Sequence, residues 1–268
     1  MELLVPERWD RILDLLRQRG RIRVEEVVED LGVSFTTARR DLRQMHQQGL
    51  VLRTRGGAVM PRHVGYDRPI SQDRQLNTVE KELIGRAAAL LMEPGDTVMT
   101  DGGTTTSAVL RHTPDTGITV VTNSLDAGPA VLDKGSVEVI FLGGTYLRSH
   151  NCAYGPITER AILSLRGDKA FIGAAGISVR DGVTDPNSLT AHVKGLMSER
   201  CNETIVVADH SKLGVATLFG AVPISSVSKL VTDSKADHST VRELRTAGVT
   251  VIIAEEFLAQ HGQEHERR

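Results

Sequence analysis

Residues 34–42 read Ser34-Phe35-Thr36-Thr37-Ala38-Arg39-Arg40-Asp41-Leu42, and they have the spacing of an amphipathic helix. Ser34 has the side chain of a good N-cap, and Gly49 is placed to end the helix. At about 100° per residue one face gathers apolar side chains, which we expect to be buried: Phe35, Ala38, Leu42 and Met45. The opposite face carries threonine, arginine and glutamine, the side chains that contact base edges and phosphates.

The residues on either side complete a small domain. Apolar stripes at helical spacing lie within residues 9–16 and 24–31, and glycines follow both stripes. Residues 50–55 then alternate apolar and polar, Gly56-Gly57 forms a tight turn, and residues 58–60 return. Three helices followed by a β-hairpin predict a winged helix-turn-helix domain over residues 1–60.

Positive charge is concentrated in this domain. The whole chain of 268 residues has a formal net charge of −2, yet residues 34–55 contain five arginines and one acid, Asp41. Arginine binds phosphate and guanine edges in a bidentate way, although an arginine-rich helix face can equally be a solvated surface. In a helix-turn-helix the N-terminal residues of the second helix lie nearest the bases.

We therefore expect DNA contacts from the helix and the hairpin. The candidate residues are Ser34, Thr36, Thr37, Arg39, Arg40, Arg43, Gln44, Arg53 and Arg55. Asp41 lies on a flank of the helix, and we expect it to pair with Arg53 or Arg55 and so to fix the hairpin.

The composition excludes several other classes of protein. Two cysteines with no CxxC spacing argue against a zinc finger or a disulfide scaffold, and nine scattered histidines form no HExxH motif. No apolar run approaches the roughly 20 residues of a membrane span. We expect a soluble cytoplasmic protein that does not act at a membrane and has neither a metal site nor a cofactor.

The rest of the chain has the pattern of an α/β domain. Residues 61–75 resemble a linker, and a helix begins near Asn77, with Glu80 completing a capping box. Seven apolar strands alternate with helical patterns, at residues 97–100, 118–122, 137–142, 170–174, 204–208, 229–232 and 249–254. This order predicts a largely parallel sheet covered by helices over residues 76–260, followed by a polar tail at 261–268.

One loop of this domain has the chemistry of an anion site. Residues 101–106 read Asp101-Gly102-Gly103-Thr104-Thr105-Thr106, after a strand and at the start of a helix. Glycines allow an anion close to the backbone, and the helix N-terminus supplies free N–H groups. The loop lacks the lysine of a Walker A motif, which argues against a nucleoside triphosphate. A purely structural turn remains the alternative.

Other strand ends also carry glycine and polar residues, and this pattern predicts a pocket at one edge of the sheet. Lys81, Lys194 and Lys212 are candidate cations for a sugar phosphate, and each is equally compatible with a surface lysine.

These blocks together resemble the DeoR family of bacterial transcription regulators. The resemblance rests on residues 34–42, on Arg53-Thr54-Arg55-Gly56-Gly57-Ala58, and on D-G-G-T-T, V-T-N-S, L-G-G and D-H-S-K in the second half. Ala38 replaces a larger aliphatic residue of the family pattern, Arg55 replaces a histidine, and His192 stands where acidic residues are common. The resemblance runs from about residue 8 to residue 233.

The resemblance implies a sensor domain with a fold similar to ribose-5-phosphate isomerase that binds a phosphorylated sugar. It implies these pocket residues: Asp101, Gly102, Gly103, Thr104, Thr105, Thr106, Asn123, Gly144, Lys194, Asp209 and Lys212. We expect a non-enzymatic repressor of a sugar operon that binds double-stranded operator DNA as a homodimer or homotetramer. The alternative is a phosphosugar isomerase with an attached DNA-binding domain.

Overall fold

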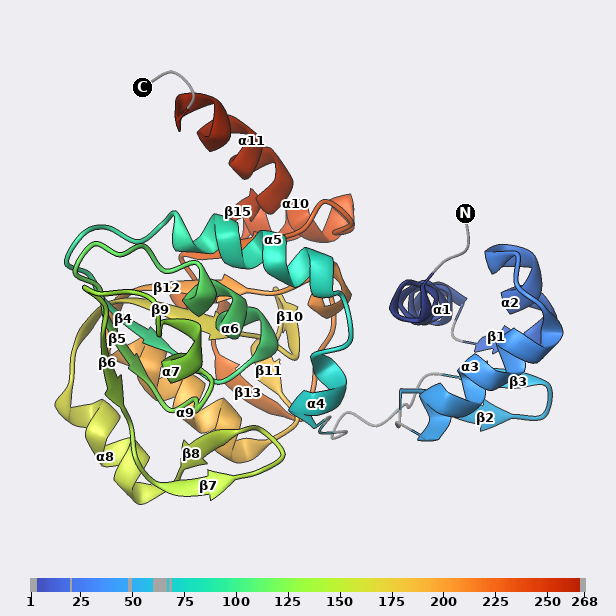
Figure 1. Ribbon diagram of the computed structural model, residues 1–268, viewed down its shortest axis with the longest axis horizontal. Helices are drawn as coiled ribbons and strands as arrows, with labels where there is room; N and C mark the ends of the chain where they lie inside the picture. Colours follow the sequence, from blue (N-terminus) through green and yellow to red (C-terminus); the bar gives the residue numbers. More distant parts are fainter. Residues whose placement is uncertain (1–3, 20, 48–49, 60–66, 68, 266–268) are drawn as a thin grey trace. The chain divides into compact units, whose positions relative to one another are not determined.

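The chain forms two compact units, residues Met1–Asn77 and Thr78–Arg268 (Figure 1). The computed structural model describes residues 4–19, 21–47, 50–59, 67 and 69–265. The predicted linker at 61–75 lies partly outside these residues, as do the glycines at 20 and 49 that were expected to end helices.

The first unit is the predicted winged helix-turn-helix. Its helices are α1 (Val5–Arg19), α2 (Val24–Leu31) and α3 (Phe35–Gln47), and its strands are β1 (Arg21–Arg23), β2 (Leu52–Thr54) and β3 (Gly57–Val59). The strands form one antiparallel sheet in the order β1-β3-β2, so the hairpin gains a third strand that the sequence did not indicate. Trp9 and Leu42 belong to a single buried cluster that joins the three helices.

Two glycines shape the hairpin for different reasons. Gly56 has φ +88°, the left-handed conformation that glycine adopts at least cost. Gly57 pairs with Arg23 of β1, and a Cβ atom there would lie 2.0 Å from the carbonyl oxygen of Ile22. The Gly56-Gly57 pair therefore serves both the turn and the close approach of β1.

Two expectations for α3 are wrong. Phe35 was predicted on the buried face but is 48% exposed. Asp41 does not pair with the hairpin arginines; its carboxylate is fully buried and accepts bonds from Nε and Nη2 of Arg8 in α1, at 2.7 and 3.1 Å. A helical wheel of α3 places Asp41 on the same side as Ala38 and Leu42, facing the interior of the unit. Arg8 neutralises the charge of Asp41 there.

The end of the predicted linker also differs from expectation. Residues Ile70–Asp73 form a short helix, α4, and Leu76 is buried in the apolar cluster of the first unit. The N–H of Asn77 donates to the carboxylate of Asp10, and the Glu80 carboxylate pairs with Lys235, so both groups of the predicted capping box have other partners.

The second unit is built on a seven-stranded parallel sheet, as predicted. The strand order is β15-β14-β12-β9-β4-β5-β6, and every neighbouring pair is parallel. The strands are β4 (Thr97–Thr100), β5 (Thr119–Thr122), β6 (Glu138–Phe141), β9 (Gly167–Gly173), β12 (Cys201–Val207), β14 (Lys229–Thr232) and β15 (Thr250–Ile253). All seven predicted strands are present, with small shifts at their ends.

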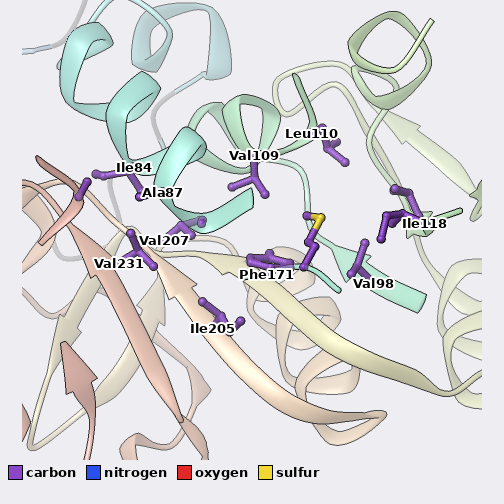
Figure 2. Packing of buried hydrophobic residues seen from close by; sticks show 14 of the residues in the cluster. Ile84, Ala87, Val98, Val109, Leu110, Ile118, Phe171, Ile205, Val207 and Val231 are labelled. Atoms are coloured by element: carbon purple, nitrogen blue, oxygen red, sulfur yellow. The ribbon is translucent and has the colours of Figure 1, made fainter. Parts of the chain in front are cut away.

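Alternate side chains of these strands enter cores on opposite faces. Val98 of β4 and Phe171 of β9 pack with helices α5 (Thr78–Ala89) and α6 (Thr104–Arg111), as Figure 2 shows. Met99 and Ile172, one residue along, enter the core that contains Met197 of helix α9 (Ser188–Glu199). Both faces of the inner strands are therefore buried, whereas the edge strand β6 is mostly exposed, and the inner strands appear in the sequence as continuous apolar runs.

Shorter elements complete the second unit. Strands β10 (Gly176–Ser178), β11 (Gly182–Asp185) and β13 (Phe219–Val222) form a small antiparallel sheet, and β7 (Thr145–Leu147) pairs with β8 (Cys152–Tyr154). The other helices are α7 (Ala127–Ala130), α8 (Pro156–Ser164), α10 (His238–Thr246), α11 (Ala254–His265) and the 3-10 turns η1 (His210–Lys212) and η2 (Ile224–Ser226).

Helix α11 corrects the prediction for the C-terminal end, because the expected polar tail at 261–268 is helical as far as His265. Within the described part of the chain, no helix is long and apolar enough to cross a membrane.

The buried Arg8–Asp41 pair yields a prediction for the stability of the first unit. Asp41→Ala leaves the Arg8 guanidinium buried without its carboxylate, and we expect a loss of about 3–5 kcal/mol in the free energy of unfolding. Trp9 is the single tryptophan and lies in the core of this unit, so its fluorescence during urea denaturation reports on this unit. The control is Asp30→Ala, which removes an exposed pair with Arg19 and is expected to cost less than about 1 kcal/mol. Equal losses in the two variants would contradict the prediction.

Candidate functional site

The exposed face of α3 carries most of the predicted DNA contacts. Thr36, Arg40 and Arg43 are exposed, and Arg39 and Gln44 flank them at the surface. Ser34 caps the helix, because its Oγ accepts the N–H of Thr37 at 3.1 Å and lies 2.9 Å from the Thr37 hydroxyl. Ser34 and Thr37 therefore fix the first turn of the helix.

The arginines of this surface keep their charge uncompensated. Arg53 in β2 and Arg55 in the hairpin turn are exposed, as are the three arginines of α3. None of the five forms an ion pair with another described residue, whereas Arg8 and Arg19 of the same unit do. Since Asp41 is buried against Arg8, the sole acid in this stretch does not reduce the surface charge. Such a surface suits the phosphates and base edges of double-stranded DNA.

The second candidate site lies where the order of the parallel sheet changes direction. From β4 the chain continues to β5 and β6 on one side, and it then returns to β9 on the other side of β4. Open α/β sheets bind ligands at the carboxyl ends of the strands at such a switch point. Here β4 is followed by Asp101 and β9 ends at Gly173.

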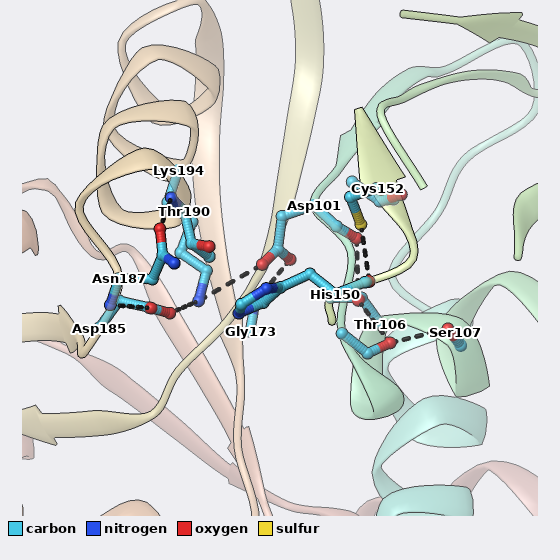
Figure 3. Close-up of polar contacts among 12 residues, drawn as sticks. Asp101, Thr106, Ser107, His150, Cys152, Gly173, Asp185, Asn187, Thr190 and Lys194 are labelled. Carbon is cyan, nitrogen blue, oxygen red and sulfur yellow. Dashed lines mark hydrogen bonds and ion pairs between the residues drawn. The ribbon is translucent and has the colours of Figure 1, made fainter. Parts of the chain in front are cut away.

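Three charged side chains meet at this point, and all are buried (Figure 3). Oδ1 of Asp101 accepts the N–H of Gly173 at 2.9 Å, while its Oδ2 has no hydrogen-bond partner and lies 3.5 Å from Nζ of Lys194. Nζ of Lys194 donates to Oδ2 of Asp185 at 2.6 Å. Lys194 comes from α9 and Asp185 from the end of β11, so the group joins the main sheet to the small sheet.

The electrostatics of this group are set by burial and by the imbalance of two carboxylates against one ammonium. Burial raises the pKa of Asp101 above its usual value, although Lys194 and the Gly173 N–H act in the opposite direction. Burial lowers the pKa of Lys194, but the carboxylates of Asp185 and Asp101 outweigh it, and the pKa is raised overall. Lys194 therefore stays charged, and Oδ2 of Asp101 is a buried acceptor that suits a hydroxyl donor.

The loop after β4 positions the N-terminus of α6 beside Asp101. Gly103 is the N-cap of α6, with Thr104 and Thr105 in the first turn. The hydroxyl of Thr106 donates to the carbonyl oxygens of Asp101 and Gly103, and that of Ser107 donates to Gly103. The Thr106 hydroxyl thus holds the loop, and Thr104 and Thr105 lie in the first turn of α6, where backbone N–H groups and the helix dipole suit an anion.

The remaining predicted pocket residues lie at the same edge of the sheet. Asn123 follows β5 and is fully buried; its Nδ2 donates to the carbonyl of Ala153 at 2.8 Å, and its Oδ1 has no hydrogen-bond partner. Gly144 follows β6 with φ +150°, and a Cβ atom there would lie 2.7 Å from the carbonyl oxygen of Tyr154. Gly144 therefore permits close contact with the end of β8.

Asp209 and Lys212 follow β12, on the other side of β9. The carboxylate of Asp209 caps η1 by accepting the N–H of Ser211, and Lys212 is half-buried in η1. The structure therefore brings Asp101 and Lys194 into direct contact, and it places Asn123 and Asp209 at the same edge of the sheet, with the ends of β4 and β9 between them. Asp185 was not among the predicted pocket residues, because the short strand that carries it was not predicted.

Comparison with known proteins adds independent information. A family model described as the DeoR-like helix-turn-helix domain matches residues 8–64, and one described as the DeoR C terminal sensor domain matches residues 76–234. The chain is 36% identical to the HTH-type transcriptional repressor GlcR of Bacillus subtilis over 93% of this chain and 96% of that protein. It is 30% identical to the glycerol-3-phosphate regulon repressor of Escherichia coli over 89% and 94%.

Solved structures show a more distant similarity. The probable sor operon regulator from Shigella flexneri aligns with a TM-score of 0.42 at 14% identity, over 63% of this chain and 88% of that one. Ribose 5-phosphate isomerase A from Methanocaldococcus jannaschii aligns with a TM-score of 0.38 at 15% identity, over 51% and 54%.

The packing of the loop predicts that one substitution lowers the stability of the chain and that a second substitution restores most of it. A Cβ atom on Gly102 would lie 1.8 Å from Sγ of Cys152, a buried thiol whose pKa burial raises to about 12. We expect Gly102→Ala to displace the loop and lower the melting temperature of the chain, since overpacking typically costs about 1–3 kcal/mol. Removing Sγ leaves the nearest atoms at 3.5 Å, so Gly102→Ala with Cys152→Ala should recover most of the loss.

The measurement is thermal unfolding followed by circular dichroism for the two single variants and the double variant. Cys152→Ala alone is the control for the lost sulfur. Additive losses in the double variant would show that the two side chains do not conflict.

Proposed function

The chain belongs to the DeoR family of transcription regulators, and on that premise we propose that it represses a sugar or carbohydrate operon and leaves its operator when a phosphorylated sugar binds the Thr78–Arg268 unit. The observation that carries this proposal is the buried group of Asp101, Lys194 and Asp185 beside the N-terminus of α6. The group and the helix N-terminus together offer contacts for sugar hydroxyls and for a phosphate.

The charges favour one orientation of such a ligand. Asp101 and Asp185 are two buried carboxyl groups beside a single ammonium, an environment that opposes a phosphate and suits sugar hydroxyls. The N-terminus of α6 has the opposite character, because its free N–H groups and its helix dipole attract anions. We therefore place the phosphate at Thr104 and Thr105 and the sugar hydroxyls at Asp101.

Release from DNA then follows from thermodynamic linkage. If the effector and the operator favour different conformations of the chain, each weakens the binding of the other by the same factor. The chain acts in this proposal as a regulator without a reaction of its own. Because helix-turn-helix proteins commonly bind two related half-sites, we propose a homodimer or homotetramer acting in the cytoplasm.

The first prediction concerns DNA binding. Arg40 is exposed on α3 and forms no ion pair with a described residue, so Arg40→Ala should weaken operator binding by about 1–3 kcal/mol if Arg40 contacts a base in a bidentate way, and should relax the base preference. Fluorescence anisotropy with labelled DNA from upstream of the chain's own operon measures this, with a scrambled duplex for comparison. Unchanged affinity and specificity would remove Arg40 from the set of base contacts.

The second prediction concerns the effector. Thr104→Ala with Thr105→Ala should leave operator affinity intact but reduce the release of DNA by sugar phosphates, because two donors beside α6 are lost. The matched control replaces both threonines by serine, which keeps the hydroxyls. Release is measured by anisotropy with a panel of sugar phosphates near physiological salt.

Normal release by the alanine variant would mean that the phosphate binds elsewhere. If the wild-type chain shows no specific DNA binding and no response across the panel, the regulator proposal fails, and assays for phosphosugar isomerase activity become the next test.

A further inference from the structure

Phe35 occupies an unusual position for a large apolar side chain. It is the first residue of α3 and is 48% exposed, and among the side chains that the structure describes between residues 6 and 59 it is the one large hydrophobic group that is exposed. Exposed apolar residues are common on proteins, so exposure alone carries little meaning. Its position at the start of the helix that faces DNA is the informative fact.

Phe35 has no evident role in folding the first unit. The cap of α3 is supplied by Ser34, and the buried side of the helix is supplied by Ala38, Leu42 and Met45. At 100° per residue, Phe35 lies 40° from Arg39 and 100° from Thr36, both of which are exposed. The ring therefore borders the surface that we assign to DNA, at the end of the helix that lies nearest the bases.

The chemistry of the major groove limits what a hydrocarbon ring can recognise there. Guanine, cytosine and adenine present hydrogen-bond donors and acceptors, whereas thymine also presents its C5-methyl group. A ring placed over a guanine edge would remove water from two acceptors and return no hydrogen bond. Contact with a methyl group buries apolar surface on both sides and carries no such cost.

We propose that Phe35 packs against the C5-methyl group of a thymine and so selects an A·T pair at one position of each operator half-site. The proposal rests on the DNA-binding function and adds a specificity-determining residue to it. Polar contacts from Thr36 and Arg40 would distinguish the neighbouring base pairs.

The test removes the methyl group from the DNA and the ring from the protein, separately and together. The probe is a duplex enriched from a random library by the full-length wild-type chain, with each thymine replaced in turn by deoxyuridine, which lacks only the C5-methyl group. At one thymine of a half-site we expect wild-type affinity to fall about fourfold, the factor that corresponds to about 0.8 kcal/mol for one buried methyl-sized group. Phe35→Ala should bind the thymine duplex at least fourfold more weakly and no longer distinguish thymine from uracil there.

Two further variants make the result specific. Phe35→Leu keeps an apolar side chain and should retain part of the discrimination. Val79→Ala changes an exposed apolar residue of the second unit, 67% exposed, and should discriminate as the wild type does. Trp9 fluorescence checks that the first unit is folded in each variant.

Three outcomes would overturn the proposal: a wild-type chain indifferent to every substitution, a Phe35→Ala variant that keeps the full thymine preference, or a uniform loss on both duplexes with the preference unchanged. Failure to enrich any common sequence would instead remove specific DNA binding itself, and this inference with it.

Discussion

The ion pairs of the Lys194 ammonium are the interactions on which the second unit depends most directly. The ammonium lies between Asp185, which ends a strand of the small antiparallel sheet, and Asp101, which follows the inner strand β4 of the large sheet. Without it, two carboxylates would be buried close together with no compensating charge, a costly arrangement inside a protein. The same ammonium fixes Asp101 at the switch point of the sheet. The charge group therefore joins the two sheets and fixes Asp101 at the proposed ligand site.

The first unit uses buried charge for a different purpose. Asp41 follows two exposed arginines in the sequence, yet it points inward and is neutralised by Arg8, 33 residues away. The Arg39-Arg40-Asp41-Leu42 motif therefore combines two functions: its arginines face solvent, while Asp41 and Leu42 anchor α3 to the rest of the unit. An acid paired with the hairpin arginines would have reduced the charge available to DNA. Burial of Asp41 leaves that charge intact.

Much of this architecture could be predicted, for an identifiable reason. The inner strands of the large sheet are buried on both faces, and the exposed edge strand β6 is also apolar at Val139, Ile140 and Phe141, so each of the seven appears as an apolar run between helical segments. All seven were found. Strands of three or four residues in antiparallel pairs, such as β1 and β11, have no such run and depend on their tertiary partners. For that reason the position of Asp185 beside Lys194 was not predicted. Phe35 was misplaced because a helical wheel gives the direction of a side chain and not whether another element covers it.

The two candidate sites share one physical arrangement, in which backbone geometry is fixed by groups that do not contact the ligand. Ser34 caps α3, whose Thr36 and arginines are the proposed DNA contacts, while Thr106 and Ser107 bond the loop before α6, whose first turn is the proposed anion site. In both cases a helix N-terminus is held rigid by hydroxyls just outside or just inside its first turn. Such a terminus binds without first losing conformational entropy, because the backbone is already ordered. In this chain Ser34 and Thr106 stand beside the candidate contact residues in the sequence, and only the direction of each hydroxyl separates the two roles.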